Sequence, residues 1–169
     1  MKTPSIHFVS LPCALGFALV AGTPRGVCFV RFGTDAPRLE TELRRTFPAA
    51  SFERAKSGGI AGWGRAVADY VDGRSDAAEV PLDVRGSQFE QRVWRALREI
   101  PAGETRSYSD IARRLGDPHA ARAVANAVSA NPAPVAIPCH RVVLKNGGFS
   151  GGAASVSYQR AMLRREGMR

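Results

Sequence analysis

Residues 107–130 read SYSDIARRLGDPHAARAVANAVSA, and this stretch decides the fold of the second half of the chain. Ser107 and Asp110 have the spacing of a capping box, in which each side chain accepts a hydrogen bond from the other residue's backbone and a helix begins. Gly116 is the residue type that ends such a helix at its C′ position. A second helix is expected over about 119–130. Two short helices joined by a glycine-containing turn have the dimensions of a helix-turn-helix.

The second of these helices is made almost wholly of small residues. Its alanines are Ala120, Ala121, Ala123, Ala125, Ala127 and Ala130. Arg122 is its only long charged side chain. Small side chains such as Ala121 and Ala123 would let the helix backbone approach a nucleic-acid groove closely. Close packing in a protein core accounts for the same composition equally well, so both interpretations stay open.

The segment before residue 107 predicts another helix. Ser87 and Glu90 have the spacing of a second capping box. A stripe of apolar side chains follows at helical spacing, and Pro101 ends the helix. The stripe consists of Phe89, Val93, Trp94, Leu97 and Ile100. The second half of the chain is therefore expected to be mostly helical.

The first half of the chain has a different pattern. Residues 5–32 are rich in alternating apolar side chains and contain a Thr-Pro-Arg-Gly turn at 23–26, which indicates strands joined as a hairpin. Apolar spacing predicts helices over 36–47 and 63–72. A connection rich in small residues over 48–62 separates these two helices.

A change in charge accompanies the change in pattern near the linker 73–86. Residues 1–84 carry 10 basic and 9 acidic residues, whereas residues 85–169 carry 14 basic and 6 acidic ones. We therefore expect an α/β (α+β) fold in two subdomains. Residues 1–80 would form a small N-terminal β-sheet with helices, and residues 81–169 a mostly helical C-terminal subdomain with the helix-turn-helix.

Composition limits the class of partner. The 169-residue chain has a formal net charge of +9, nearly all of it in the second half. A basic lobe on a near-neutral body favours a polyanionic partner, nucleic acid before a membrane surface. A hydrophobic content of 44% with 23% charged residues excludes a disordered or collagen-like chain. No unbroken run of about 18 apolar residues occurs, which excludes a transmembrane helix.

Cysteine usage indicates a reducing compartment. The chain has three cysteines, Cys13, Cys28 and Cys139, so they cannot all be paired in disulfides. Their spacing fits no zinc site, and unpaired thiols are typical of a reducing compartment. The apolar stretch over residues 8–21 resembles a signal peptide, but proline and glycine interrupt it and no clear cleavage site follows. We therefore expect a cytoplasmic protein without a metal site.

Residues 131–143, NPAPVAIPCHRVV, contain the strongest candidate for chemistry. Their three prolines exclude a helix and stiffen the chain beside Cys139 and His140. A thiol reacts as the thiolate, and a neighbouring imidazole and the guanidinium of Arg141 lower its pKa. Glu166 near the end of the chain is available to orient the histidine, as in a catalytic triad. A structural Cys-His pair is the alternative, and for an isolated dipeptide it is the commoner one.

The run Ile137-Pro138-Cys139-His140-Arg141-Val142 resembles the motif of the O6-alkylguanine-DNA alkyltransferases. Further matches at family spacing cover residues 81–166 almost completely. They are PLDVRG at 81–86, the helix from Phe89 to Trp94, IPAGET at 100–105, Ser107-Tyr108, ARAV at 121–124, Asn131-Pro132, Ser150-Gly151 and LRRE at 163–166. Residues 10–50 resemble the family's N-terminal subdomain weakly. The chain is most similar to the methyltransferase half of the bacterial adaptive-response regulator and its free-standing homologues, and this implies a ribonuclease H-like fold for residues 1–80.

The resemblance implies repair of DNA by irreversible transfer of the alkyl group from guanine O6, and less readily from thymine O4, to the protein's own cysteine. Cys139 would attack as the thiolate, with His140 as general base through a water molecule and Glu166 orienting the imidazole. Tyr108 would protonate or hydrogen-bond the leaving guanine, because its oxygen becomes negative as the bond breaks. The nucleotide must first be flipped out of the duplex.

The same resemblance implies binding roles for other residues. Arg122 would fill the gap left by the flipped base. Asn131 would brace the active-site turn, although a plain helix stop before a proline explains it equally well. The backbone carbonyls of Cys139 and Val142 would accept from the guanine amino group, and the N–H of Ser150 would face O6. The implied partner is double-stranded DNA bearing O6-alkylguanine, bound by a monomer that needs neither cofactor nor metal.

One stretch and one single position depart from the family pattern. The family has an aromatic-basic-aromatic stretch after Ser150-Gly151, where this chain has Gly152-Ala153-Ala154. The loop over the pocket is therefore expected to be looser. Relatives often carry a lysine in the last helix where this chain has Gln159, so any role of that lysine would be vacant or would pass to Arg160.

Three other functions compete with alkyl transfer. A non-catalytic alkylguanine sensor would bind the lesion, but such sensors lack the cysteine of this motif, which is present here as Cys139. A helix-turn-helix regulator would need a dimer interface and a polar recognition helix. A cysteine hydrolase would need an oxyanion hole, which no part of the sequence indicates.

Overall fold

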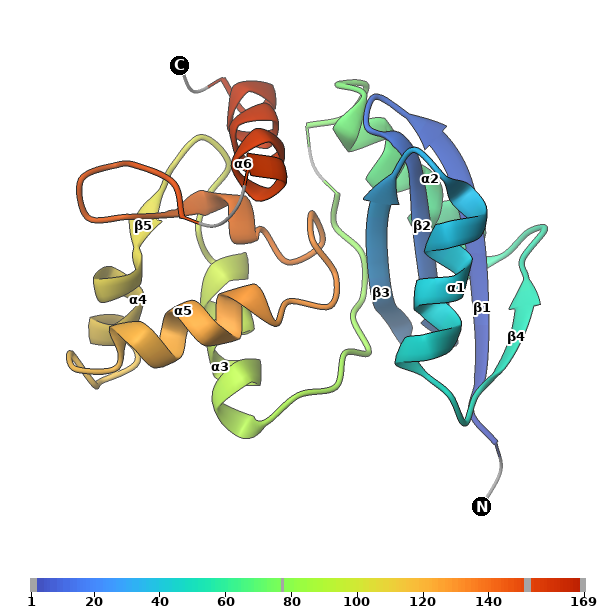
Figure 1. Ribbon diagram of the computed structural model, residues 1–169, viewed down its shortest axis with the longest axis horizontal. Coiled ribbons are helices and arrows are strands. Elements are labelled where there is room, and N and C mark those ends of the chain that lie inside the picture. Colours follow the sequence, from blue (N-terminus) through green and yellow to red (C-terminus); the bar gives the residue numbers. More distant parts are fainter. Residues whose placement is uncertain (1–2, 77, 151–152, 168–169) are drawn as a thin grey trace. The chain divides into compact units, whose positions relative to one another are not determined.

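The chain folds as two compact units, residues 1–84 and residues 85–169. The computed structural model describes residues 3–76, 78–150 and 153–167. Figure 1 labels its helices and strands.

The N-terminal unit is a four-stranded sheet. One helix lies on each face of this sheet (Figure 1). The strands lie in the order β3-β2-β1-β4. β2 pairs antiparallel with both β1 and β3, whereas β4 pairs parallel with β1. The strands are β1 (Ser5–Cys13), β2 (Gly16–Thr23), β3 (Gly26–Gly33) and β4 (Ser51–Arg54), and the helices are α1 (Ala36–Thr46) and α2 (Gly59–Val71).

Alternation along β1 explains why both faces of the sheet are covered. Successive side chains of a strand point to opposite faces. Phe8 joins Leu39 and Leu43 of α1 in one hydrophobic cluster. Val9 points to the other face, where a side chain at Gly64 of α2 would collide with it. Glycine at this position therefore allows α2 to lie close against the sheet.

The hairpin predicted with its turn at 23–26 is confirmed. β2 and β3 pair antiparallel, and Thr23 and Gly26 are partners next to the turn. The connection predicted over 48–62 is wrong in part, since it contains β4 and the first turn of α2. β4 is a short edge strand with three exposed residues out of four, so it lacks the apolar alternation that marks a strand.

The first unit ends a few residues beyond the boundary expected after residue 80. The reason is that the chain just past this point still pairs with β3. The N–H of Val27 donates to the carbonyl of Pro81 at 2.8 Å, and the N–H of Asp83 donates to the carbonyl of Val27 at 2.8 Å. This segment therefore belongs to the sheet rather than to a free linker.

The C-terminal unit is mostly helical, as the sequence predicts. α3, α4 and α5 pack against one another, and β5 and β6 form a short parallel pair. The elements are α3 (Gln88–Arg98), β5 (Arg106–Ser107), α4 (Tyr108–Arg114), α5 (Ala121–Ser129), the 3₁₀ turn η1 (Cys139–Arg141), β6 (Val142–Val143) and α6 (Ala153–Arg165).

Both predicted capping boxes are confirmed. The hydroxyl of Ser87 accepts from the N–H of Glu90 at 3.1 Å, and the Glu90 carboxylate accepts from the N–H of Ser87 at 2.9 Å. The matching distances for Ser107 and Asp110 are both 3.0 Å. Gly116 follows α4 with a φ of +88°, a left-handed conformation that favours glycine. α4, this turn and α5 form the predicted helix-turn-helix.

The alanine-rich helix α5 has one buried and one exposed face. Val124 and Ala127 are buried in the unit's core. The indole N–H of Trp94 on α3 donates to the carbonyl of Ala127 at 2.8 Å, which joins the two helices. Arg122 and Ala123 lie on the exposed face. The helix therefore packs closely on one side and presents a small-residue surface with one arginine on the other.

Candidate active site

Asn131 closes the proline-rich turn that leads to the cysteine. Its side chain is buried, its Nδ2 donates to the carbonyl of Ile137 at 2.9 Å, and its Oδ1 accepts from the N–H of Ala133 at 2.9 Å. The N–H of Ile137 also donates to the carbonyl of Ala133 at 2.8 Å. Val135 inside the turn has a φ of +76°, which is strained for a β-branched residue. Such a conformation persists only where the surroundings hold it, and the Asn131 amide provides that restraint.

Cys139 begins the 3₁₀ turn η1 that follows. Its N–H donates to the carbonyl of Ile137 at 2.7 Å, and the N–H of Arg141 donates to the carbonyl of Pro138 at 3.1 Å. Cys139 forms no disulfide and is half-buried, whereas His140 beside it is fully buried. The turn thus leaves Cys139 partly exposed and directs the imidazole into the protein.

A buried ion-pair network lies behind Cys139. Nε2 of His140 lies 2.8 Å from Oε1 of Glu166, and the two side chains are 0% and 1% exposed. The guanidinium of Arg141 donates through Nε to both carboxylate oxygens at 3.0 Å and through Nη2 to Oε1 at 2.6 Å. The N–H of Gly103 donates to Oε2 at 3.3 Å. A carboxylate with this many charge-assisted donors is held ionised and in one orientation.

These contacts determine the protonation of the imidazole. Burial lowers the pKa of His140 below its ordinary value, against the opposing effect of Glu166. The ring is therefore neutral near pH 7. Because the Glu166 carboxylate can only accept, the ring hydrogen lies on Nε2 and the lone pair lies on Nδ1. His140 is thus in the tautomer that can receive a proton at Nδ1.

Sequence reasoning placed the guanidinium of Arg141 beside the thiol and did not foresee its pairing with Glu166. Arg141 also donates through Nη1 to the carbonyl of Ile100 at 2.8 Å. The guanidinium therefore acts on the carboxylate that orients His140. No sequence signal marks this pair, because Arg141 and Glu166 lie 25 residues apart in the chain.

Tyr108 and Ser150 come together although they are far apart in the chain. The Tyr108 hydroxyl and the Ser150 Oγ lie 2.7 Å apart. Tyr108 is the first residue of α4, directly after the N-cap Ser107. The capping box therefore fixes the position of the Tyr108 backbone, from which the side chain extends. The departure at Gly152-Ala153-Ala154 cannot be followed in the same way, since Gly152 lies outside the described residues and Ala153 and Ala154 are described only as the start of α6.

Gln159, at the position where relatives often carry lysine, makes side-chain contacts of its own. Gln159 is buried, and its Nε2 donates to the carbonyls of His140 and Val142. Arg160 instead is exposed and places its guanidinium 5.7 Å from the centre of the Phe149 ring. Gln159 therefore faces the turn that carries the cysteine, and Arg160 does not replace it there.

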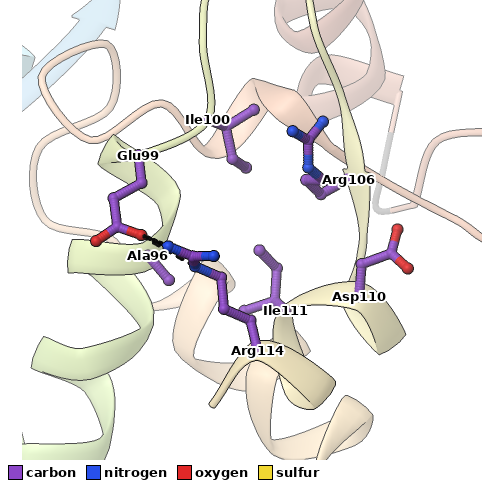
Figure 2. A pocket seen from close by; sticks show the side chains of 7 residues that line it. All are labelled: Ala96, Glu99, Ile100, Arg106, Asp110, Ile111 and Arg114. Atoms are coloured by element: carbon purple, nitrogen blue, oxygen red, sulfur yellow. Dashed lines mark hydrogen bonds and ion pairs between the residues drawn. The ribbon is translucent and has the colours of Figure 1, made fainter.

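A cavity of about 490 Å³ in the same unit is lined by neither Cys139, His140 nor Glu166 (Figure 2). It is lined by Ala96, Glu99, Ile100, Arg106, Asp110, Ile111 and Arg114. Figure 2 shows the guanidinium of Arg114 directed at the carboxylate of Glu99, with Nε donating at 3.0 Å. The lining includes neither the thiol nor the imidazole, so this cavity is not where the candidate nucleophile reacts.

The residues that the structure describes contain no group of three or more His, Cys, Asp or Glu side chains placed to hold a metal ion. Within the same residues, none of the helices is long and apolar enough to cross a membrane.

Sequence comparison relates the chain to DNA alkylation repair proteins. Residues 88–168 match the family model of the 6-O-methylguanine DNA methyltransferase, DNA binding domain. The bifunctional transcriptional activator/DNA repair enzyme Ada of Escherichia coli is 42% identical over 162 residues, which are 96% of this chain but 46% of Ada. A methylated-DNA–protein-cysteine methyltransferase of Methanosarcina acetivorans is 32% identical over 96% of this chain and 99% of its own. The chain thus spans about half of Ada and nearly all of the archaeal relative.

Structural comparison extends the similarity to both units. A crystal structure of Mycobacterium tuberculosis O6-methylguanine methyltransferase superposes with a TM-score of 0.77 and 33% identity, covering 95% of this chain and 92% of that one. A crystal structure of M. tuberculosis OGT in complex with DNA superposes with a TM-score of 0.74 and 33% identity, covering 96% and 92%. The α/β fold expected from the sequence is therefore confirmed.

Proposed function

Since the chain belongs to the methylated-DNA–protein-cysteine methyltransferase family, we propose that it repairs DNA by moving an alkyl group from guanine O6 to the sulfur of Cys139. The observation that carries this proposal is a partly exposed Cys139 on a proline-stiffened turn, followed by the buried His140–Glu166 pair. This step needs no protein partner, zinc ion or cofactor, because a thiolate can displace the alkyl carbon by itself. The DNA-bound structure of an M. tuberculosis relative supports DNA as the partner.

The step balances without an external reactant. The thiol proton passes through a water molecule to Nδ1 of His140, and the Cys139 thiolate attacks the alkyl carbon in line with the carbon–O6 bond. A sulfur–carbon bond forms, the carbon–O6 bond breaks, and its electron pair stays on O6. Tyr108 stabilises the charge that develops on the leaving guanine by donating a hydrogen bond or its proton. The product thioether is stable, so each protein molecule acts once.

The backbone around Cys139 supports guanine as the substrate base. The carbonyls of Cys139 and Val142 have lone pairs that can accept from the exocyclic amino group, and the N–H of Ser150 is available to O6. Thymine has no such amino group. O4-alkylthymine would therefore bind more weakly and react less readily.

The exposed face of α5 is suited to docking on a duplex. Its alanines permit close approach, and the half of the chain that contains it carries 14 basic and 6 acidic residues. Neutralising phosphates would supply most of the affinity. The reacting carbon is inaccessible in stacked DNA, so the nucleotide must rotate out into the site.

Arg122→Ala is expected to slow repair of duplex O6-methylguanine by roughly 100-fold, because unstacking costs a few kcal/mol that an inserted side chain offsets. Reaction with free O6-benzylguanine, which needs no flipping, should change less than about twofold. Single-turnover rates on both substrates measure the difference. Arg95→Ala, which removes an equal charge from the exposed side of α3, is the control and should slow neither reaction. Equal slowing of both substrates by Arg122→Ala would show that Arg122 supports the pocket instead.

Stoichiometry tests the proposed function against its competitors. With methylated duplex in excess, transfer should stop when each protein molecule has accepted one alkyl group, because no residue regenerates the thiol. Counting labelled methyl groups per protein molecule measures this endpoint. A lesion sensor would bind the duplex and take up no label, and a hydrolase would continue to turn over. Either result would contradict the proposal.

A further inference from the structure

Gln159 is a buried polar residue of α6 that contacts the backbone next to Cys139. Its side chain is 8% exposed. Nε2 donates to the carbonyl of His140 at 3.2 Å and to the carbonyl of Val142 at 2.5 Å. Both neighbours are carbonyl oxygens, which can only accept, so the nitrogen of the amide must be the atom that faces them.

The segment that Gln159 contacts consists of two very short elements. η1 is a single 3₁₀ turn of three residues, and β6, which follows it, has two residues. One side chain that binds a carbonyl in each of these elements therefore restricts the conformation of both. The two hydrogen bonds from Gln159 therefore hold this segment at two points.

We propose that Gln159 is a positioning residue that holds the Cys139 thiol and the Val142 carbonyl in the geometry that one guanine base requires. This inference rests on the alkyl transfer proposed above. In that reaction Gln159 occupies one lone pair of the Val142 carbonyl and leaves the second for the guanine amino group. Gln159 carries no charge, so it acts through geometry.

The geometry of this turn affects the rate because the reacting atoms must meet at close range. A misplacement of about 1 Å can cost on the order of 100-fold in rate. Gln159 touches the backbone and not the reacting sulfur, so its loss should cost less than that. It should lower the limiting rate of transfer and leave duplex affinity unchanged.

Three variants of the full-length chain test the inference. Gln159→Met keeps the length of the side chain and removes both donors, whereas Gln159→Lys keeps donors for the two carbonyls. Ser157→Ala changes an exposed residue of the same helix and is the control. The measurements are the limiting rate with free O6-benzylguanine, the number of alkyl groups finally bound per protein, and duplex affinity. The number of alkyl groups finally bound per protein reports the fraction of molecules that are folded and reactive. The limiting rate can therefore be assigned to those molecules alone.

Gln159→Met should lower the limiting rate about tenfold, with the endpoint and duplex affinity unchanged, and Gln159→Lys should restore the rate to within about threefold of wild type. Ser157→Ala should react at the wild-type rate. A Gln159→Met protein whose folded fraction reacts at the wild-type rate would overturn the inference. So would a loss that Gln159→Lys does not relieve.

Amide hydrogen exchange over residues 139–143 provides a readout that does not depend on alkyl transfer. Exchange should be faster in Gln159→Met than in wild type and should return toward the wild-type rate in Gln159→Lys. If the wild-type protein accepts no alkyl group, the proposed function fails while exchange still tests the restraint on the turn. Unchanged exchange in Gln159→Met would overturn the positioning role.

Discussion

Cys139→Ser is expected to abolish alkyl transfer, with a rate loss of more than about a thousandfold. A serine hydroxyl stays protonated near neutral pH. His140, whose pKa burial keeps below its ordinary value, is too weak a base to ionise that hydroxyl, so no anionic nucleophile forms. The measurement is uptake of labelled methyl from an O6-methylguanine duplex with the protein in excess.

The serine variant should still bind DNA, because the exposed face of α5 is unchanged. Cys13→Ser is the matched control, since Cys13 is also a half-buried cysteine outside any disulfide but belongs to the N-terminal unit. It should take up label as wild type does. Label uptake by Cys139→Ser, or its loss in Cys13→Ser, would show that another residue is the acceptor.

Glu166→Gln is expected to slow transfer by roughly 100-fold while keeping the shape of the side chain. The amide NH₂ can donate to Nε2 of His140, which would move the ring hydrogen to Nδ1 and remove the base. Glu166 also raises the pKa of His140, so its loss leaves a weaker base. Without an effective base the Cys139 thiol must lose its proton to solvent, which happens at more alkaline pH. The midpoint of the pH–rate profile should therefore move to higher pH.

The same substitution should lower stability. The Arg141 guanidinium would remain buried without its counter-charge, and breaking such a pair typically costs about 3–5 kcal/mol. Denaturant unfolding measures this loss, and single-turnover rates over a pH series measure the effect on chemistry. Glu99→Gln removes a carboxylate that is 50% exposed and should alter neither. An unchanged pH–rate profile in Glu166→Gln, even with lowered stability, would show that Glu166 is structural only.

The elements that could be predicted from sequence are those with local signals. The capping boxes at Ser87 and Ser107 and the glycine at 116 depend on residues a few positions apart, so the helix starts and the helix-turn-helix were predictable. β4, β5 and β6 were not, because they are two to four residues long and depend on partners distant in sequence. α2 was expected to start later than it does, since glycines at its beginning resemble a loop.

The candidate site shows the same division. The proline-rich turn and the adjacent Cys139 and His140 are visible in the sequence, and triad logic nominated Glu166 as the carboxylate that orients the histidine. The pairing of Arg141 with Glu166 and the contacts of Gln159 with the turn were not foreseen. Both depend on how α6 lies against η1, which the hydrophobic pattern of α6 does not specify.

The identity of the alkyl acceptor can be measured directly by mass. Wild-type protein is incubated with an O6-methylguanine duplex, its intact mass is determined, and the modified peptide is then sequenced. The protein should gain a single methyl group as a thioether on Cys139, and the duplex should regain guanine in equal amount. A methyl group on any other residue, or loss of the lesion with no gain in protein mass, would contradict Cys139 as the acceptor.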